Sequence, residues 1–186
     1  MSHLSYFVLF LFSFLMLTSF VIAQSPELNR DICRQYFELS PEKAKASSTL
    51  QGYPASNAID SDINTRWFGS AEEPYPKWIQ FDLNSNRCVN SADLAFFFRD
   101  TPLTFKLEIS EDGKSWINLS DEVSLKEGED LAKVGFFPKI GRYVRLSELA
   151  GKREYGSLSE VKLSSSALRS ADGNKKGFSS IFSKQS

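Results

Sequence analysis

The sequence predicts an all-β fold, a β-sandwich or barrel, from three observations. Short runs of β-branched and aromatic residues alternate in polarity, turn residues separate these runs, and no run shows the apolar spacing of an amphipathic helix. The 186 residues are enough for one domain of ordinary size plus two ends. We therefore expect a single domain built from sheets.

The expected strands cover residues 78–83, 91–98, 104–110, 115–120, 131–137, 142–149 and 157–163. In 78–83 and 104–110 polar and apolar residues alternate, which predicts strands with one buried face. Residues 91–98 are more uniformly apolar, which predicts a strand covered on both faces. The dipeptide Asp112-Gly113 predicts a tight hairpin turn, because glycine tolerates positive φ.

The N-terminal segment, residues 1–23, is predicted to be a secretory signal peptide. It carries no Lys, Arg, Asp or Glu and is apolar from about Tyr6 onwards, and the small residues Val21 and Ala23 suit cleavage after Ala23. An uncleaved membrane anchor is the alternative, because about 18 apolar residues nearly span a bilayer. We expect a secreted, extracellular protein, or a membrane-anchored one if the segment is retained.

Composition divides the remainder into a lead-in segment (24–40), a domain (41–164) and a flexible tail (165–186) rich in Ser, Lys and Gly. The tail holds one acid, Asp172, and four bases, Arg169, Lys175, Lys176 and Lys184. The rest of the mature chain is therefore mildly acidic, since the whole sequence has a formal net charge of −1. A mildly acidic body has no electrostatic surface for nucleic acid, so no nucleic-acid partner is expected.

The only cysteines are Cys33 and Cys88. In an exported chain such a pair is more often bridged than free, so we expect a disulfide; two buried thiols are the alternative. The single histidine, His3, lies in the predicted signal peptide, so no zinc site is expected.

Asp60, Asp62 and Asn64 occupy every second position of one short stretch. The spacing D-x-D-x-N begins the calcium loop of helix-loop-helix proteins, which also needs Gly at its sixth position and Glu at its twelfth. Those positions hold Thr65 and Ala71, so this kind of calcium loop is excluded. The side-chain oxygens of Asp60, Asp62 and Asn64 must therefore have another role.

Four stretches, taken together and in order, resemble the discoidin, or coagulation factor 5/8 type C, domain family, one of the galactose-binding-domain-like β-sandwiches. They are ASSTLQGYPASNAIDSDINTRW (46–67), WIQFDL (78–83), FKLEISEDGKSW (105–116), and GRYVRL with SLSEVKL (141–146 and 157–163). The resemblance implies a jelly-roll sandwich of about eight strands. Such domains bind ligands through loops at one end and perform no chemistry of their own.

The resemblance also implies a structural cation, usually calcium, between the first long loop and a Ser-Glu pair near the C-terminus. The implied ligands are the side chains of Asp60, Thr65 and Glu160, the backbone carbonyls of Asn57 and Ser159, and Asp62 through its side chain or carbonyl. Hard oxygens of this kind suit calcium. The alternative is that Asp60 and Asp62 only cap a tight turn. The family usually has glycine where Ser61 stands, so Ser61 is strained if its φ is positive.

A binding module needs aromatic and polar side chains on its loops, because sugars offer C–H faces to rings and hydroxyls to planar polar groups. The candidates for ligand binding are Arg66, Phe68, Tyr75, Arg99, Asp100, Arg153 and Tyr155. Trp67, Trp78 and Trp116 are expected to pack in the sandwich. The arginines of RYVRL are expected to support strand packing or a buried hydrogen-bond network.

The sequence favours a secreted, non-catalytic module that binds carbohydrate on cell surfaces or extracellular glycans, as in cell adhesion. A phospholipid-binding or membrane-surface module, or one for protein adhesion, is the alternative. An enzyme is not expected, because glycoside hydrolysis needs two carboxylates across a cleft and the acidic pairs here are too local.

Overall fold

The computed structural model describes residues 33, 37–97, 101–151 and 156–165. The chain divides into two compact units, Met1–Asp31 and Ile32–Ser186. The first unit, with the predicted signal peptide, lies outside the described residues. Within the described part, no helix is long and apolar enough to cross a membrane.

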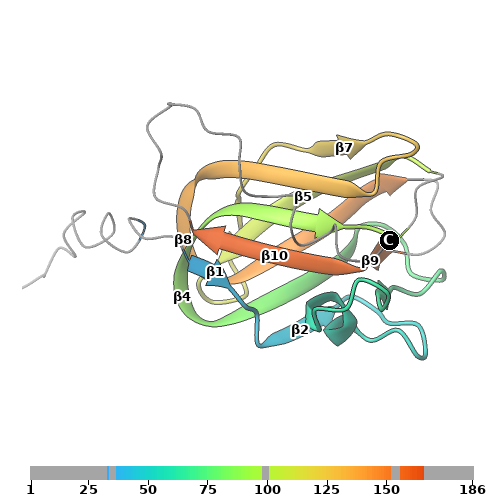
Figure 1. Ribbon diagram of the computed structural model, residues 1–186, viewed down its shortest axis with the longest axis horizontal. Coiled ribbons are helices and arrows are strands. Elements are labelled where there is room, and N and C mark those ends of the chain that lie inside the picture. The colour runs from blue at the N-terminus through green and yellow to red at the C-terminus, as the bar shows by residue number, and fades with distance from the viewer. Residues whose placement is uncertain (1–32, 34–36, 98–100, 152–155, 166–186) are drawn as a thin grey trace, which may run out of the picture. The chain divides into compact units, whose positions relative to one another are not determined.

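The second unit is built from antiparallel strands, which confirms the predicted all-β class. The strands are β1 (Phe37–Leu39), β2 (Lys43–Ala46), β3 (Trp67–Phe68), β4 (Lys77–Ala95), β5 (Leu103–Ser110), β6 (Ile117–Asn118), β7 (Val123–Leu125), β8 (Leu131–Gly151), β9 (Ser157–Leu158) and β10 (Glu160–Ser165) (Figure 1). One short 3-10 helix, η1 (Ala55–Ile59), lies between β2 and β3.

Two long, curled strands, β4 and β8, create the two layers of the sandwich (Figure 1). The first half of β4 pairs with β2, and its second half pairs with β10. The second half of β8 likewise pairs with β5 from Tyr143 onwards. Both strands bend at the register shifts between Asp82 and Arg87 and between Val89 and Ser91. The segments expected as separate strands, 78–83 and 91–98, therefore belong to one strand that serves both layers of a jelly roll.

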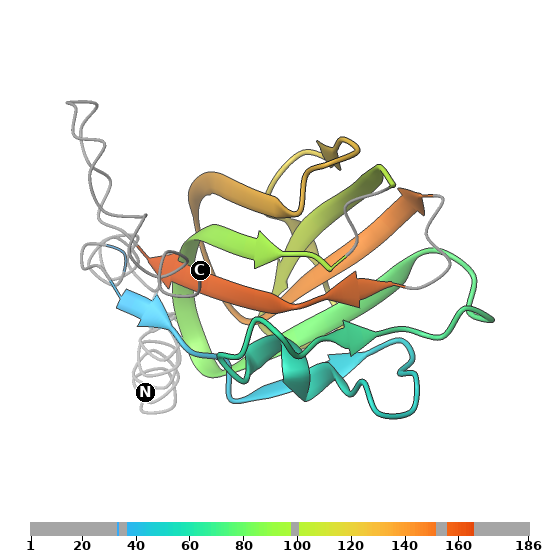
Figure 2. The ribbon, with the colours of Figure 1, turned by 45° about the vertical axis from the view of Figure 1, so that its right-hand side comes forward.

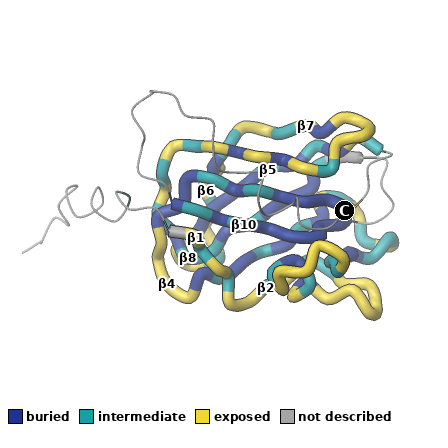
Figure 3. The backbone as a smooth tube through the Cα atoms, viewed as in Figure 1, coloured by how far each residue is buried: buried dark blue, intermediate teal, exposed yellow. Residues whose placement is uncertain are grey.

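The core lies between these layers and follows the predicted alternation. Ile79 and Phe81 of β4 are fully buried, whereas Trp78 and Gln80, which alternate with them on the opposite face, are half-buried. Trp67 is fully buried, as expected, and its indole Nε1 donates a hydrogen bond to the carbonyl of Ser48 at 2.9 Å. Figure 3 shows β5 and β10 mostly buried, whereas exposed stretches lie on the loops and on parts of β4 and β8.

The expectation that residues 91–98 are covered on both faces is wrong. Ala92 and Leu94 are buried, but Asp93 is only half-buried and β4 ends at Ala95. Asp93 lies in register between Lys162 of β10 and Lys133 of β8. This charged row forms the solvent side of the sheet, so the strand has one buried face rather than two.

The arginines of RYVRL hold the strands through carboxylates, as expected. Arg142 forms a two-point ion pair with Asp82, with nitrogen–oxygen distances of 2.8 and 2.9 Å. Arg145 and Ser147 both donate to Oε2 of the buried Glu108 at 3.0 Å. Burial alone would raise the pKa of Glu108, but the side-chain hydrogen bonds of Lys106, Ser147 and Arg145 and the positive charge of Arg145 lower it overall.

Two connections tie the lead-in segment to the sandwich. Cys33 and Cys88 form a disulfide with their Cα atoms 5.4 Å apart, which joins the lead-in segment to β4. The last part of that segment, β1, pairs with β10 and so joins the sheet.

The hairpin predicted at Asp112-Gly113 is confirmed, because β5 and β6 pair across it and Gly113 has a φ of +72°. The Asp112 carboxylate accepts hydrogen bonds from the backbone amides of Lys114 and Ser115, each at 2.8 Å, and from the hydroxyl of Ser110 at 3.0 Å. The backbone amides of Ser115 and Lys114, followed by the Ser110 hydroxyl, lower the pKa of Asp112 to about 2.

We expect this turn to stabilise the fold near neutral pH and to lose that effect in acid. A carboxyl with a lowered folded-state pKa stabilises the fold above its unfolded pKa, and that stabilisation is lost as the pH falls through the folded value. Wild type should therefore lose more stability than Asp112→Asn between about pH 4 and pH 2. Urea unfolding at several pH values in this range measures the free energy of unfolding. Lys114→Gln is a control that keeps both backbone amides. Parallel wild-type and Asp112→Asn profiles would contradict the assignment.

Candidate functional site

The loop between η1 and β3 gathers oxygen atoms around one hydroxyl. Oγ1 of Thr65 lies 2.7 Å from Oδ2 of Asp60, 3.0 Å from the carbonyl oxygen of Asp62 and 3.2 Å from that of Asn57. A hydroxyl has one proton and can donate to only one of these three acceptors at a time. We call these groups, together with the Glu160 carboxylate described next, the oxygen cluster.

Glu160 comes to this cluster from the start of β10. Its side chain is buried, with the residue only 8% exposed, and Oε2 has no hydrogen-bond partner within the described residues. Burial, together with the negative charge of Asp60, raises the pKa of Glu160 to about 7, although the backbone amides of Val161 and Ser61 oppose part of this shift. The implied neighbours Asp60 and Glu160 are therefore close enough to act on each other electrostatically.

The oxygen cluster fits a hard cation. Asp60 and Glu160 supply carboxylates, Thr65 a hydroxyl, and Asn57 and Asp62 backbone carbonyls, which are the donors that calcium prefers. The described part of the chain has no group of three or more Asp, Glu, His or Cys arranged to hold a metal, so a cation here would rely on neutral oxygens as well. Glu160, buried and lacking a partner for one oxygen, is the group that would gain most from a positive charge.

Two details refine the implied ligand set. Oδ1 of Asp62 accepts hydrogen bonds from the backbone and side-chain nitrogens of Asn64, both at 2.9 Å, whereas the backbone carbonyl of Asp62 is its oxygen atom that lies 3.0 Å from the Thr65 hydroxyl. Ser159 is buried beside Glu160, and its backbone amide donates to the carbonyl of Ala95. Ser61 has a φ of +66°, so the conformation that favours glycine at this position is present.

Next to the oxygen cluster, three aromatic rings and a guanidinium form a surface that we call the platform: Tyr53, Arg66, Phe68 and Phe97. The ring centroids of Tyr53 and Phe68 are 4.7 Å apart, and those of Phe68 and Phe97 are 5.6 Å apart. The guanidinium carbon of Arg66 lies 3.7 Å from the ring centroid of Phe97. Phe97 is 45% exposed and Tyr53 is 37% exposed, whereas Phe68 is buried beneath them.

Hydrogen bonds connect the platform to the oxygen cluster. The side-chain amide of Asn57 donates to the carbonyl of Arg66 at 3.0 Å, and the guanidinium of Arg66 donates to the carbonyl of Asn64 at 2.8 Å. Nε of Arg66 is buried and has no hydrogen-bond partner within the described structure, so the guanidinium keeps an unused donor. The loop that carries the oxygen cluster therefore also holds Arg66.

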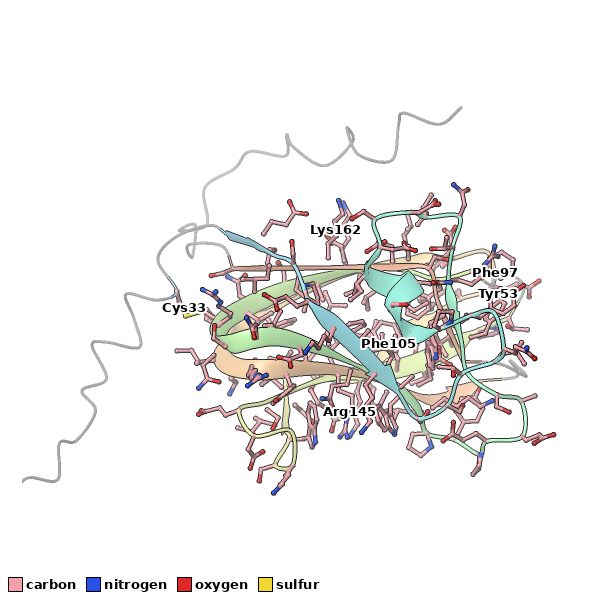
Figure 4. The ribbon with its side chains drawn as sticks, turned by 90° about the horizontal axis from the view of Figure 1, so that it is seen from below. Cys33, Tyr53, Phe97, Phe105, Arg145 and Lys162 are labelled. Carbon is pink, nitrogen blue, oxygen red and sulfur yellow. A yellow bond between two sulfur atoms is a disulfide. The ribbon has the colours of Figure 1, made fainter. Side chains whose placement is uncertain are left out.

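The platform lies at one end of the sandwich. Figure 4 shows Tyr53 and Phe97 together at that end, with Cys33 at the other. Figure 2 shows the loop that follows β2 at the same end of the sandwich as the short strand β3. The backbone amide of Gly69 donates to the carbonyl of Gly156, which holds the chain before β9 against the end of β3.

The predicted ligand-binding residues do not all fall in the same part of the structure. The structure brings Arg66 and Phe68 into the platform. It places the Nζ of Lys77 5.5 Å from the ring centroid of Tyr75. The remaining candidates, which fall outside the described residues, are Arg99, Asp100, Arg153 and Tyr155.

Sequence reasoning missed Tyr53 and Phe97. A signal for Phe97 exists in the chain, because the buried positions Ala92 and Leu94 continue at Phe96, which places Phe97 on the opposite, outward side. Tyr53 follows a glycine in a turn, and no periodic pattern marks its role.

The family model for the F5/8 type C domain matches residues 43–161. The match covers more than half of the chain, and the protein belongs to the F5/8 type C, or discoidin, domain family. Among curated proteins, no relative matches this chain.

Solved structures with the same fold include several carbohydrate-binding modules. The family 32 module of AlyQ, in complex with 4,5-unsaturated mannuronic acid, is 22% identical with a TM-score of 0.61, over 68% of this chain and 97% of that one. The family 32 module of NanJ from C. perfringens, in complex with galactose, is 20% identical with a TM-score of 0.62, over 69% and 98%. Chitosan-binding module 1 of the chitosanase/glucanase from Paenibacillus sp. IK-5 is 25% identical with a TM-score of 0.57, over 68% and 98%.

Proposed function

We propose that this protein is a secreted, non-catalytic module that binds carbohydrate of cell surfaces or extracellular glycans through the platform. The observation that carries the proposal is the Arg66 guanidinium, 3.7 Å from the centre of the exposed ring of Phe97. A ring presents a flat apolar face to the C–H groups of a sugar, and a guanidinium beside it presents planar donors to the hydroxyls. Similar modules that bind galactose or a mannuronic acid derivative support this choice of ligand.

A binding role suits the platform better than catalysis does. Glycoside hydrolysis requires two carboxyl groups that flank the scissile bond. The platform itself consists of rings and one cation, and the nearby carboxylates of Asp60 and Glu160 belong to the oxygen cluster, where Glu160 is buried.

We also infer that the oxygen cluster holds calcium as a structural cation. When bound, the ion would supply a positive charge that compensates the Asp60 and Glu160 carboxylates. The chain's own contribution is to join the loop before β3 to the start of β10. Because Asn57 and Asn64 bond to Arg66, a fixed loop also fixes the guanidinium of the platform.

The membrane-surface alternative has one observation in its favour, since Leu50 and Ile63 are exposed apolar side chains on the same loops. Binding to anionic lipid needs such side chains to be flanked by Lys or Arg. Here the exposed neighbours of Ile63 in the chain are Asp62 and Asn64, neither of which is basic. Carbohydrate is therefore the better match.

The proposal is tested by exposing the chain without its predicted signal peptide to a glycan array and, in parallel, to phosphatidylcholine vesicles with and without phosphatidylserine. We expect retention on defined saccharides and equal, weak retention on both kinds of vesicle. Binding to phosphatidylserine vesicles alone would replace carbohydrate with lipid as the ligand. Binding to neither saccharides nor vesicles would contradict the proposed role of the platform.

A further inference from the structure

The first half of β8 is an edge of the sandwich. Residues Leu131 to Lys139 pair with β4 on one side, whereas the pairing of β8 with β5 begins only at Tyr143. Among the described strands, none pairs with the other side of Leu131 to Lys139. An edge of this kind offers backbone donors and acceptors to a further extended segment.

An open groove of about 520 Å³ runs beside this edge, lined by residues 118–123 and 135–137. Phe137 is 84% exposed, more than any other large apolar side chain in the described part of the chain. Ile117, next to the groove, is 59% exposed. Asp121 and Glu122 add two exposed acidic side chains to its wall. The groove therefore combines an exposed ring, a free strand edge and negative charge.

We propose that the C-terminal segment of this same chain, KKGFSSIF at residues 175–182, docks in this groove along the edge of β8. The segment offers what the groove lacks: the apolar side chains of Phe178, Ile181 and Phe182, and the positive charges of Lys175 and Lys176. It lies outside the described residues, so its place is inferred from the groove and from where the described chain ends.

The end of β10 lies close to the groove. Ser164 pairs with Ser91 of β4, and Ser91 pairs with Gly135 of the groove, so the chain leaves the sheet two strands away. Two strand spacings are roughly 10 Å. The residues between, 166–174, can span about 30 Å when extended, which is more than the path requires.

Covalent attachment favours this occupant over a second copy of the chain. A short tether gives the segment an effective concentration in the millimolar range. The opposite charges add a local attraction between Lys175 or Lys176 and the pair Asp121 and Glu122. Docking also covers Phe137, the most exposed ring among the described residues.

Hydrogen–deuterium exchange on the chain without its predicted signal peptide tests the proposal. The wild type is compared with the triple variant Phe178→Ser/Ile181→Ser/Phe182→Ser, with Ser179→Ala/Ser180→Ala as the matched control. We expect amides of residues 131–139 to exchange about tenfold faster in the triple variant and unchanged in the control. Equal exchange in wild type and the triple variant would overturn the proposal.

A second variant reports on the ring itself. In Phe137→Trp, docking should shift the added tryptophan emission to shorter wavelength, and the triple substitution in the same chain should reverse the shift. Protection of 131–139 that rises with protein concentration would mean that a second copy fills the groove, and would also overturn the proposal.

Discussion

Replacing Phe97 by alanine is expected to weaken binding of the saccharide retained on the array by about 10- to 100-fold, or roughly 1.4 to 2.8 kcal/mol. The exposed ring supplies the stacking face, and its loss also frees the Arg66 guanidinium that lies 3.7 Å from the ring centre. Isothermal titration calorimetry measures the change. Phe137→Ala is the matched control, because Phe137 is an exposed ring outside the platform and its loss should leave the affinity unchanged.

Variants of Arg66 test whether its positive charge or its planar shape is needed for saccharide binding. Arg66→Ala should weaken binding about as much as Phe97→Ala, and Arg66→Lys should restore only part of the loss, because an ammonium lacks the planar donors that pair with hydroxyls. Unchanged affinity in both Phe97→Ala and Arg66→Ala would show that the platform is not the binding surface.

Calcium at a hundredfold excess over its dissociation constant is expected to stabilise the wild type by about 2.7 kcal/mol. For a domain of this size the midpoint of thermal unfolding should rise by roughly 10 °C relative to the sample with chelator. Glu160→Gln should abolish this rise, because it removes the buried carboxylate of the oxygen cluster. In chelator the same variant should be at least as stable as wild type, since a neutral amide avoids the burial of a charge.

Asp62→Asn is the control for this experiment. Asp62 contributes its backbone carbonyl to the oxygen cluster, and its side-chain oxygen accepts bonds from Asn64 that an amide oxygen can also accept. The calcium response of Asp62→Asn should therefore match that of wild type. Calcium would be excluded from this site if the wild-type unfolding midpoint did not change with calcium. The same would follow if calcium raised the midpoint of Glu160→Gln as much as that of wild type.

Local pattern predicted much of the fold because alternation and turn chemistry act over a few residues. The alternating stretches became buried-face strands, and Asp112-Gly113 formed the expected hairpin. The curl of β4 escaped prediction because it depends on pairing. Residues 84–87 resemble a polar turn, and Asn84 has a φ of +67°, yet pairing with β8 stops at Asp82 and resumes at Arg87, so one strand continues through the bend.

The site was less predictable because its parts lie far apart in the chain. Asp60, Thr65 and Glu160 were connected only through the resemblance to the family, since no spacing rule joins a loop to a distant strand. Phe97 joined the platform because β4 ends two residues earlier and turns the ring towards Arg66. Tertiary placement of this kind has no local signal in the sequence.

We propose that one end of the sandwich binds carbohydrate through the platform, next to the loop that carries the oxygen cluster and holds Arg66. Titration of the isotope-labelled chain with the retained saccharide, followed by amide and side-chain NMR shifts, tests this most directly. The account predicts that the largest shifts fall on Tyr53, Arg66, Phe68 and Phe97. Shifts concentrated instead at the other end, around Cys33 and Cys88, would contradict it.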